Sequence, residues 1–343
     1  MKTDQEPTRI PLPTDRRKTE PMWAYELTGP SEFQRVEMPS LTSDDLEDGQ
    51  VLLRTLAGGI CGSDLPLFLG RQSWLWKGST TQSKPGFPLH EIAGVVVSSR
   101  HHRLQPGDRV VGWASGCDAL AELTVCEGDE LAPYAADLPA EVAVLLQPFA
   151  CVLYAVDQIG RVDGKVCAVI GLGPIGVLFT HVLASRGAAR VIGVDRADKA
   201  DVCASFGVDE FVRGSSDMWA ARILPDERPD ILIEAVGHQV STLTDLVTAA
   251  APEGRIYYFG LPDDPVYPFP LMEFLRKNLT FVSGVTRDRS TALAAAIRYL
   301  GEHPDLAHTY VTNTFPIDQV QDAFTAAVRP VPGQVKVSLV MSE

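Results

Sequence analysis

The sequence predicts an α/β protein of two domains, a β-rich first domain followed by one built on a doubly wound parallel sheet. The chain has 343 residues, and at about 150 residues per domain this length suggests two domains. Up to residue 148, short apolar runs are separated by turns that contain glycine and proline, a pattern typical of β-barrels and sandwiches. After that point, strand-like runs alternate with helix-length segments, which is typical of a parallel sheet with helices on both faces.

The first domain is expected to span residues 22–148. Residues 1–21 are expected to form a mobile tail before it, because they are rich in proline, threonine and charge. The clearest strands of this domain are expected at 51–56, 92–97 and 109–112.

The second domain is expected to span residues 149–286, and residues 287–343 are expected to return to the first domain. The alternating pattern predicts strands at 166–170, 190–194, 231–235 and 255–259, with helices at 174–185, 199–206 and 242–251. The last segment predicts helices at 290–300 and 317–328 and strands at 311–315 and 335–340.

Composition excludes several classes of protein. Hydrophobic residues make up 45% and charged residues 22% of the chain, which is ordinary globular usage and excludes wholesale disorder. The net charge of −14 repels a phosphate backbone and argues against nucleic acid as a partner.

The expected cellular location follows from two features that the sequence does not show, a membrane span and a signal peptide. No apolar stretch approaches the roughly 20 residues of a membrane span, and the N-terminus shows no apolar signal core. We therefore expect a cytoplasmic protein that does not bind a membrane. The cysteines at 61, 117, 126, 151, 167 and 203 form no CxxC pair, so they are expected to be thiols or metal ligands.

A glycine-rich motif predicts a dinucleotide site. Residues 171–176 read GLGPIG, directly after the expected strand 166–170. Gly171, Gly173 and Gly176 suit a tight turn, close approach of a pyrophosphate and helix packing, and Pro174 and Ile175 open a helix whose N-terminus attracts phosphate. The alternative is a glycine-rich turn with no ligand.

An acidic residue completes the motif. Asp195 ends the next expected strand, nineteen residues after Gly176, where a carboxylate that binds the ribose belongs. Asp195 would repel a 2′-phosphate, so NAD is favoured over NADP, although the neighbouring Arg196 weakens that preference. Gly237, and Gly260 with Leu261, follow two further strands, where ligands of such sheets lie; either glycine is equally well explained as the start of a loop.

Three residues of the first domain suit a metal. Cys61 is followed 29 residues later by His90, and Glu91 comes next. A thiolate, an imidazole and a carboxylate are ligands that Zn²⁺ accepts. Taken alone, a cysteine and a histidine at this spacing are more often ordinary buried residues.

The order of these motifs resembles the zinc-dependent medium-chain dehydrogenases, the superfamily of alcohol and polyol dehydrogenases. The similarity covers about residues 22–340 and rests on phrases that occur in the family's order: GICGSD at 59–64, HE at 90–91, GDRV at 107–110, QP at 147–148 and GLGPIG at 171–176. The resemblance implies a GroES-like catalytic domain before a Rossmann-type coenzyme domain.

The resemblance also implies roles for individual residues. Cys61 and His90 would be ligands of one catalytic zinc, with Glu91 as a third or alternating ligand. Ser63 would pass the proton of the alcohol toward solvent. Asp64 would hold the far ring nitrogen of His90 and so fix its tautomer. The plainer interpretation makes Asp64 a helix cap and Ser63 a turn hydroxyl.

The chain departs from the family pattern at several places. Gln147 stands where the family places a carboxylate or thiolate, so it would contact the metal's bound water, or zinc would be weak or absent. Cys151, one helical turn later, is a reserve ligand or, more simply, a small buried residue. Only Cys117 and Cys126 follow the GDRV turn, so no structural zinc is expected. Pro66 replaces a histidine that relays protons in many members, and Leu89 replaces the usual glycine before His90.

The implied reaction is the oxidation of a secondary alcohol to a ketone, or the reverse, with hydride transfer to NAD. Motifs similar to GICGSD occur in members of the family that act on polyols, sugars or cyclitols. The segment 68–84 is a weak candidate for substrate contact through Arg71, Trp74, Trp76 and Lys77; a surface loop pinned by two tryptophans is the alternative.

Two other functions remain open. The first is a zinc-free reductase of activated double bonds or ketones, which Gln147 and Pro66 favour. The second is an NAD-binding protein without turnover. Members of the family usually pair through the coenzyme domain, so a homodimer or homotetramer is expected, with 257–259 and 261–270 as candidate edge elements.

Overall fold

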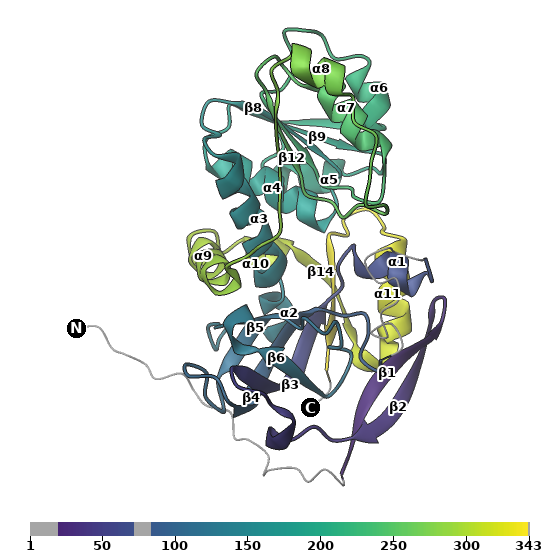
Figure 1. The fold of residues 1–343 in the computed structure, drawn as a ribbon, viewed down its shortest axis with the longest axis vertical. Coiled ribbons are helices and arrows are strands. Elements are labelled where there is room, and N and C mark those ends of the chain that lie inside the picture. Colours follow the sequence, from purple (N-terminus) through teal and green to yellow (C-terminus); the bar gives the residue numbers. More distant parts are fainter. Residues whose placement is uncertain (1–19, 72–83, 342–343) are drawn as a thin grey trace, which may run out of the picture. The chain divides into compact units, whose positions relative to one another are not determined.

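The structure is a computed structural model that describes residues 20–71 and 84–341. It divides into two compact units, each described by itself below. The first unit comprises Met1–Ala150, Asp288–Pro330 and Lys336–Glu343, and the second comprises Cys151–Arg287 and Val331–Val335. Figure 1 labels many of their elements.

The first unit is built on a seven-stranded sheet. Its strands follow the order β14-β15-β3-β4-β5-β7, β6 pairs with β3, and β1 and β2 form a separate hairpin. The strands are β1 (Pro21–Gly29), β2 (Glu32–Pro39), β3 (Gln50–Gly59), β4 (Glu91–Ser99), β5 (Arg109–Trp113), β6 (Leu123–Glu127), β7 (Leu131–Pro133), β14 (Val311–Pro316) and β15 (Lys336–Val340). The α-helices are α1 (Asp64–Phe68), α2 (Ala140–Ala143), α3 (Leu146–Ile159, which continues into the second unit), α9 (Arg289–Glu302), α10 (Leu306–Thr309) and α11 (Val320–Val328).

The central strands of this sheet place the site. β3 and β4 are rich in buried apolar residues, and they pair antiparallel with Gly59 opposite Glu91. A side chain at position 59 would collide with the carboxylate of Glu91 unless that carboxylate moved. The close pairing brings the residues that follow β3 beside those that begin β4.

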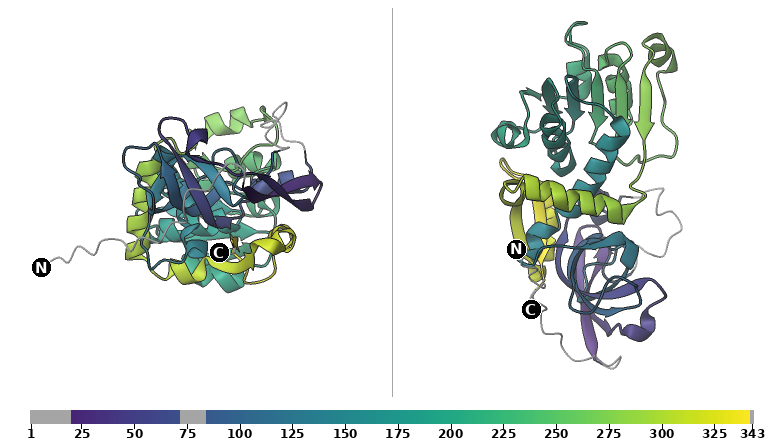
Figure 2. Two further views of the ribbon diagram at one scale, coloured as in Figure 1. Left: turned by 90° about the horizontal axis from the view of Figure 1, so that it is seen from below. Right: turned by 90° about the vertical axis from the view of Figure 1, so that its left-hand side faces the viewer.

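The second unit contains a six-stranded sheet in which every pairing is parallel, in the order β10-β9-β8-β11-β12-β13. Helices cover both of its faces (Figures 1 and 2). This confirms the predicted doubly wound α/β fold. The strands are β8 (Val166–Ile170), β9 (Arg190–Asp195), β10 (Glu210–Arg213), β11 (Ile231–Glu234), β12 (Arg255–Tyr258) and β13 (Thr280–Ser283), and the helices are α4 (Pro174–Ser185), α5 (Ala200–Cys203), α6 (Ser216–Ala220), α7 (Ser241–Ala249) and α8 (Leu271–Arg276).

Some expectations need correction. Pro21 belongs to β1, so this strand includes the last residue assigned to the tail. The helix expected over 199–206 ends at Cys203, because a 3₁₀ turn follows and Gly207 takes the left-handed conformation with φ of 69°. Residues 257–259 are not an edge element, since β13 pairs with β12 and Tyr257 is buried.

The statement that no stretch is long and apolar enough to span a membrane is also wrong. Ala140–Ile159 has 20 residues and contains an 18-residue window with a mean hydropathy of 1.7, and so passes by length and composition. The segment forms α2 and α3, and 72% of its apolar window is buried inside the fold. A buried core helix meets the same criterion, so the segment is weak support for a membrane span.

Candidate functional site

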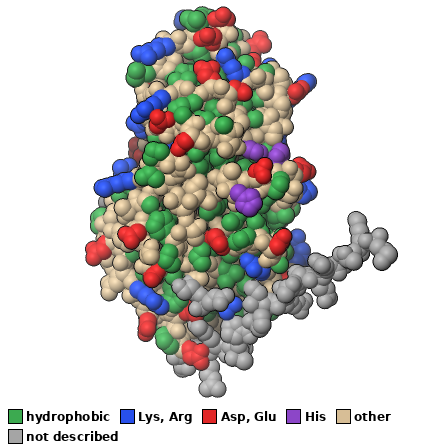
Figure 3. Space-filling view, turned by 180° about the vertical axis from the view of Figure 1, so that it is seen from behind, with side chains coloured by type: hydrophobic (Ala, Val, Ile, Leu, Met, Phe, Trp, Pro, Cys, Tyr) green, Lys and Arg blue, Asp and Glu red, His purple; other side chains and the backbone are tan. Residues whose placement is uncertain are grey.

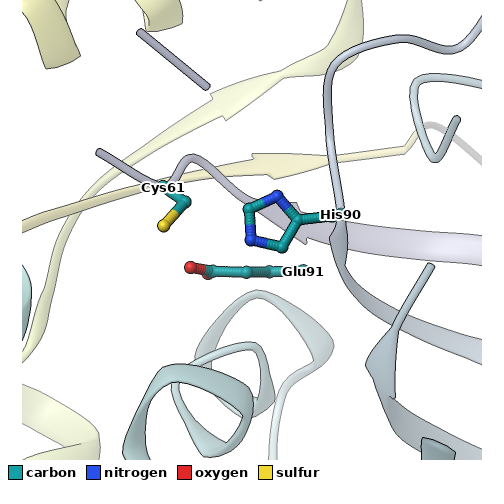
Figure 4. A group of neighbouring side chains, drawn as sticks. All are labelled: Cys61, His90 and Glu91. Carbon is teal, nitrogen blue, oxygen red and sulfur yellow. The ribbon is translucent and has the colours of Figure 1, made fainter. Parts of the chain in front are cut away.

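Three potential metal ligands converge in the first unit. Cys61 lies just after β3, His90 lies just before β4, and Glu91 begins β4. The ligand atoms of the three side chains all lie within 4.8 Å of one another. Figure 4 shows the thiol, the imidazole and the carboxylate directed toward a common space. Within residues 20–71 and 84–341, no other such group of three histidine, cysteine or acidic side chains occurs.

Asp64 holds two of these residues in place. Its Oδ1 lies 2.9 Å from Nδ1 of His90, and its Oδ2 accepts the backbone N–H of Cys61 at 2.8 Å. The carboxylate is buried at the start of α1. Because an ionised carboxylate can only accept, this contact places the ring proton on Nδ1 and leaves Nε2 of His90 available as a ligand.

The environment favours the protonated ring when no metal is bound. Burial lowers the pKa of His90, but the charge and hydrogen bond of Asp64, together with the Cys61 thiol, raise it well above its usual value. A metal at this place would therefore compete with a proton for the His90 ring.

A buried lysine partners the third residue. Lys336 donates a hydrogen bond to Oε1 of Glu91 at 2.7 Å. Its ammonium also stands 2.6 Å from Oε2, yet that oxygen accepts no well-directed hydrogen bond from the described residues. Burial raises the pKa of Glu91, and Lys336 and His90 oppose that rise without cancelling it. Lys336 could not be predicted from the sequence as a partner of Glu91, since the two residues lie 245 positions apart.

The residues present fit a zinc ion. Zinc in proteins is bound by thiolate, imidazole and carboxylate, and catalytic sites use three such ligands with one open position. Oε2 of Glu91 is buried without a well-directed hydrogen bond and lies 2.6 Å from the Lys336 ammonium, so a metal ion would share this oxygen with Lys336. Cys61, His90 and Glu91 would hold the ion.

The other predicted site residues of the first unit lie outside the group of Cys61, His90 and Glu91. Ser63 is partly exposed just before α1, and Gln147 is buried at the start of α3. Cys151 is a partly exposed cysteine outside any disulfide and does not join the group of three. Arg71 is exposed after α1. The remaining candidates for substrate contact lie outside the described residues: Trp74, Trp76 and Lys77.

Cys117 and Cys126 are free thiols within the first unit. Burial raises the pKa of Cys117 to about 11 and that of Cys126 well above its usual value. Both are therefore held as neutral thiols in the absence of a metal.

The glycine-rich turn of the second unit has the shape that a pyrophosphate needs. Gly171 has a φ of 91°, and a side chain at Gly176 would collide with the Gly171 carbonyl. A side chain at Gly173 would meet nothing within 4 Å, so this position is open. Gly173 caps α4, and the first turn begins with Pro174, which has no N–H, followed by Ile175, whose free N–H suits an anion.

Asp195 lies at the end of β9 beside this turn. Its Oδ2 accepts the N–H of Leu172 at 2.7 Å, and its Oδ1 accepts that of Ala197 at 2.8 Å. Arg196 is exposed next to it. The carboxylate is thus fixed to the glycine-rich turn, where it can accept ribose hydroxyls.

The loops after β11 and β12 meet. The N–H of His238 donates to the carbonyl of Leu261 at 2.8 Å, and a side chain at Gly260 would collide with the backbone of Gly237. Glu234, the buried last residue of β11, bonds to both loops. The sequence analysis missed Glu234, because a single acid at the end of an apolar run gives no periodic signal.

Comparison with known proteins agrees with this architecture. A family model described as alcohol dehydrogenase GroES-like domain matches residues 47–136, and one described as zinc-binding dehydrogenase matches residues 174–300.

Among curated proteins, D-altritol 5-dehydrogenase of Agrobacterium fabrum is 26% identical over 85% of this chain and 92% of its own length. D-arabinitol dehydrogenase 1 of Uromyces fabae is 22% identical over 81% of this chain and 86% of its own length. Among solved structures, the alcohol dehydrogenase of Thermus sp. ATN1 has a TM-score of 0.79 at 24% identity, covering 94% of this chain and 100% of that one.

Proposed function

Because the chain belongs to the zinc-type medium-chain dehydrogenase superfamily, we propose that it oxidises a secondary alcohol to a ketone, or catalyses the reverse, with a nicotinamide coenzyme. The observation that carries the proposal is the convergence of Cys61, His90 and Glu91 within 4.8 Å. The relatives that act on sugar alcohols support a polyol, sugar or cyclitol as the substrate.

The residues of the first unit have distinct tasks in this reaction. Cys61, His90 and Glu91 would hold one zinc ion, which would supply the Lewis acidity that stabilises negative charge on the substrate oxygen. Asp64 keeps Nε2 of His90 directed at that position, and Lys336 compensates the buried charge of Glu91. No structural zinc is included in the proposal.

A bound nicotinamide coenzyme would supply the hydride acceptor at its C4, where it would take the hydrogen and electron pair of the carbinol C–H bond. The hydroxyl proton goes to Ser63 and from there to water, because Pro66 offers no group to continue a relay. The C–O bond then becomes a carbonyl.

We propose NAD in preference to NADP. Asp195 presents a carboxylate where the 2′-position of the adenosine ribose would lie. Of the two nearby arginines, Arg213 is paired with Asp198 at 3.3 Å. Arg196 remains exposed and is the residue that favours the phosphorylated coenzyme.

The wider setting of the proposal is a cytoplasmic homodimer or homotetramer acting on a small molecule. On the face shown in Figure 3, acidic and basic side chains of the described residues alternate and do not form one basic stripe. Together with the net charge of −14, this disfavours nucleic acid as a partner.

A second candidate function is a zinc-free reductase of activated double bonds or ketones. Gln147 favours it, because a buried amide lacks the charge of the carboxylate or thiolate expected there. A protein that binds NAD without turnover is the third candidate.

Elemental analysis combined with an NAD-linked screen of polyols, cyclitols and sugar derivatives tests the proposal. We expect one zinc per chain, turnover of at least one alcohol, and loss of both in Cys61→Ser. Cys203→Ser, which changes a buried thiol of the second unit, is the control and should keep both. A metal-free protein that reduces an enone would establish the reductase instead. Full zinc occupancy with NAD binding and no turnover would establish the non-catalytic alternative.

A further inference from the structure

We propose that Glu234 is a positioning residue for the coenzyme: its buried carboxylate joins the loops after β11 and β12 into one coenzyme-binding edge. The inference rests on the proposed function only in taking the ligand of the second unit to be a nicotinamide dinucleotide.

Glu234 occupies the place in the sheet where such a ligand crosses. In the order β10-β9-β8-β11-β12-β13, β8 and β11 are adjacent, and Glu234 lies opposite Ile170, the last residue of β8. Chain connections run in opposite directions on the two sides of this pair, which makes it the topological switch point. Ligands of open α/β sheets bind at the carboxyl ends of the strands at that point.

Both oxygens of the carboxylate are used, and they serve two loops. Oε1 accepts the N–H groups of Val236 at 3.2 Å and Gly237 at 3.0 Å. Oε2 accepts the N–H of Gly260 at 3.2 Å and that of Gly237 at 3.2 Å. One side chain therefore fixes the backbone after β11 and the backbone after β12.

Glycines allow the two loops to close over the carboxylate. A side chain at Gly260 would collide with Oε2 of Glu234 and with the backbone nitrogen of Gly237. Gly237 has a φ of 65°, and a side chain there would lie 3.0 Å from the nitrogen of Leu261. The close approach thus needs glycine at both positions, which explains the two glycines that the sequence places after these strands.

The glycine-rich turn at Gly171 also contacts the loop after β11. A side chain at Gly171 would lie 2.7 Å from Cγ2 of Val236. The N–H of Ala235 donates to the carbonyl of Ile170 at 2.9 Å. A shift of the loop after β11 would therefore reach the glycine-rich turn as well as the loop after β12.

A purely structural role explains this residue poorly. Glu234 is 0% exposed, and no lysine or arginine in the described part of the chain forms an ion pair with it. Burial of a carboxylate without a cation is costly, and polar groups retained at such a cost are concentrated at functional sites. Positioning of the coenzyme loops is a function that can offset that cost.

Glu234→Gln tests the proposal, because the amide keeps the shape but presents an NH₂ group to backbone N–H donors. We expect the dissociation constant of NADH, measured by fluorescence titration, to rise about tenfold, the effect of losing one to two such bonds. The KM for NAD should rise in parallel while kcat at saturating coenzyme changes less. The zinc content of the first unit should not change.

Asp230→Asn is the matched control. Asp230 also accepts a backbone N–H in the same sheet, that of Val166 at 2.9 Å. It lies just before β11, at the amino ends of the strands, whereas Glu234 lies at their carboxyl ends. Substitution of Asp230 should lower the unfolding temperature and leave the dissociation constant of NADH within about twofold of the wild-type value.

The outcomes separate the inference from the proposed function. If wild-type protein binds neither NADH nor NADPH, the proposed function fails. If the wild type binds NADH and Glu234→Gln binds it equally well, or if Asp230→Asn weakens binding as much as Glu234→Gln, the inference is overturned. If Glu234→Gln does not fold, Gly260→Ala decides, since it keeps the carboxylate but separates the loops; unchanged NADH affinity there would also overturn the inference.

Discussion

Asp64 is the residue on which the geometry of the proposed metal site most depends. Its two carboxylate oxygens bind the backbone of Cys61 and the ring of His90. Partners of this kind orient a ligand and raise its basicity, and their loss costs about 10–100-fold in metal affinity. The site is therefore expected to respond strongly to a change that removes no ligand.

Asp64→Asn should lower zinc affinity by about 10–100-fold while leaving the fold intact. Competition with a chromophoric chelator measures the affinity. Asp108→Asn is the matched control, because Asp108 accepts the N–H of Gln105, three residues before it, at 2.8 Å, as Asp64 does for Cys61. Equal affinity in Asp64→Asn and the wild type would show that the aspartate does not support the metal.

The pH dependence of zinc binding follows from His90. Asp64 and Cys61 outweigh burial and raise the pKa of His90 well above its usual value, so the metal-free ring stays protonated above the usual pH of about 6.5. The apparent affinity for zinc should therefore still increase as pH rises from 6.5 toward 8. Titration calorimetry in buffers of different ionisation enthalpy measures the protons released. No dependence of affinity on pH over this range would contradict the assignment of His90 as a ligand.

The raised pKa of His90 also makes the stability of the metal-free protein depend on pH. A histidine whose folded pKa is raised contributes stability that is full below its unfolded pKa of about 6.5 and is lost as pH rises through the folded pKa. The stability lost in metal-free Asp64→Asn should thus be greatest at pH 6 and should shrink at alkaline pH. Urea unfolding at several pH values measures this difference.

For individual residues, the order of the motifs predicted the grouping of Cys61, His90, Glu91 and Asp64, because all four lie near one pair of antiparallel strands. It could not predict Lys336, whose contact with Glu91 joins β15 to β4 through the fold of the whole unit. Sequence carries no local signal for a partner 245 residues away.

The C-terminal end of helix α7 is capped by Lys277, the residue that follows α8. Nζ of Lys277 donates to the carbonyls of Val247 at 2.8 Å, Thr248 at 2.7 Å and Ala250 at 3.1 Å. These carbonyls lack partners within the helix, and a cation at a helix C-terminus also interacts well with the helix dipole. Lys277 therefore stabilises the C-terminal end of α7.

Lys277→Met should lower the free energy of unfolding by about 1–3 kcal/mol, because the carbonyls lose their donor. Chemical denaturation measures this change. Lys165→Met is the control, since Lys165 is about half exposed and lies 3.6 Å from its partner Asp230, a geometry that contributes at most ~1 kcal/mol. Equal losses in the two variants would refute the capping role.

Central strands were predictable and edge strands were not. β8, β9 and β11 are short runs of buried apolar residues bounded by turns, so their sequences predict them. β10 and β13 carry few buried residues because one side of each has no neighbouring strand in the sheet. Their sequences consequently show neither an apolar run nor an alternation, and pairing with β9 and β12 decides their conformation.

At the scale of the whole molecule, the edge strand β13 is a candidate contact between copies of the chain. Exposed apolar side chains gather in the second unit near this strand and α8, namely Leu271, Met272, Leu275, Phe281 and Val285. An exposed strand edge with apolar neighbours is a site at which another chain can pair. A second copy of this chain is the partner that the proposed homo-oligomer requires.

Phe281→Lys should shift the protein toward the monomer, because the charge would be buried at the paired edge. Light scattering coupled to gel filtration measures the mass. Leu224→Lys is the control, since Leu224 is an exposed apolar residue of the same unit that follows α6, away from β13. An unchanged mass for Phe281→Lys would place the interface elsewhere.

The proposed alcohol oxidation requires one cation held by side chains of the first unit. Zinc K-edge absorption spectroscopy of the purified protein measures this directly. The expected spectrum shows one sulfur at about 2.3 Å and nitrogen or oxygen neighbours near ~2.0–2.1 Å, with the sulfur shell lost in Cys61→Ser. Absence of bound zinc, or a shell of four sulfurs, would contradict the central claim.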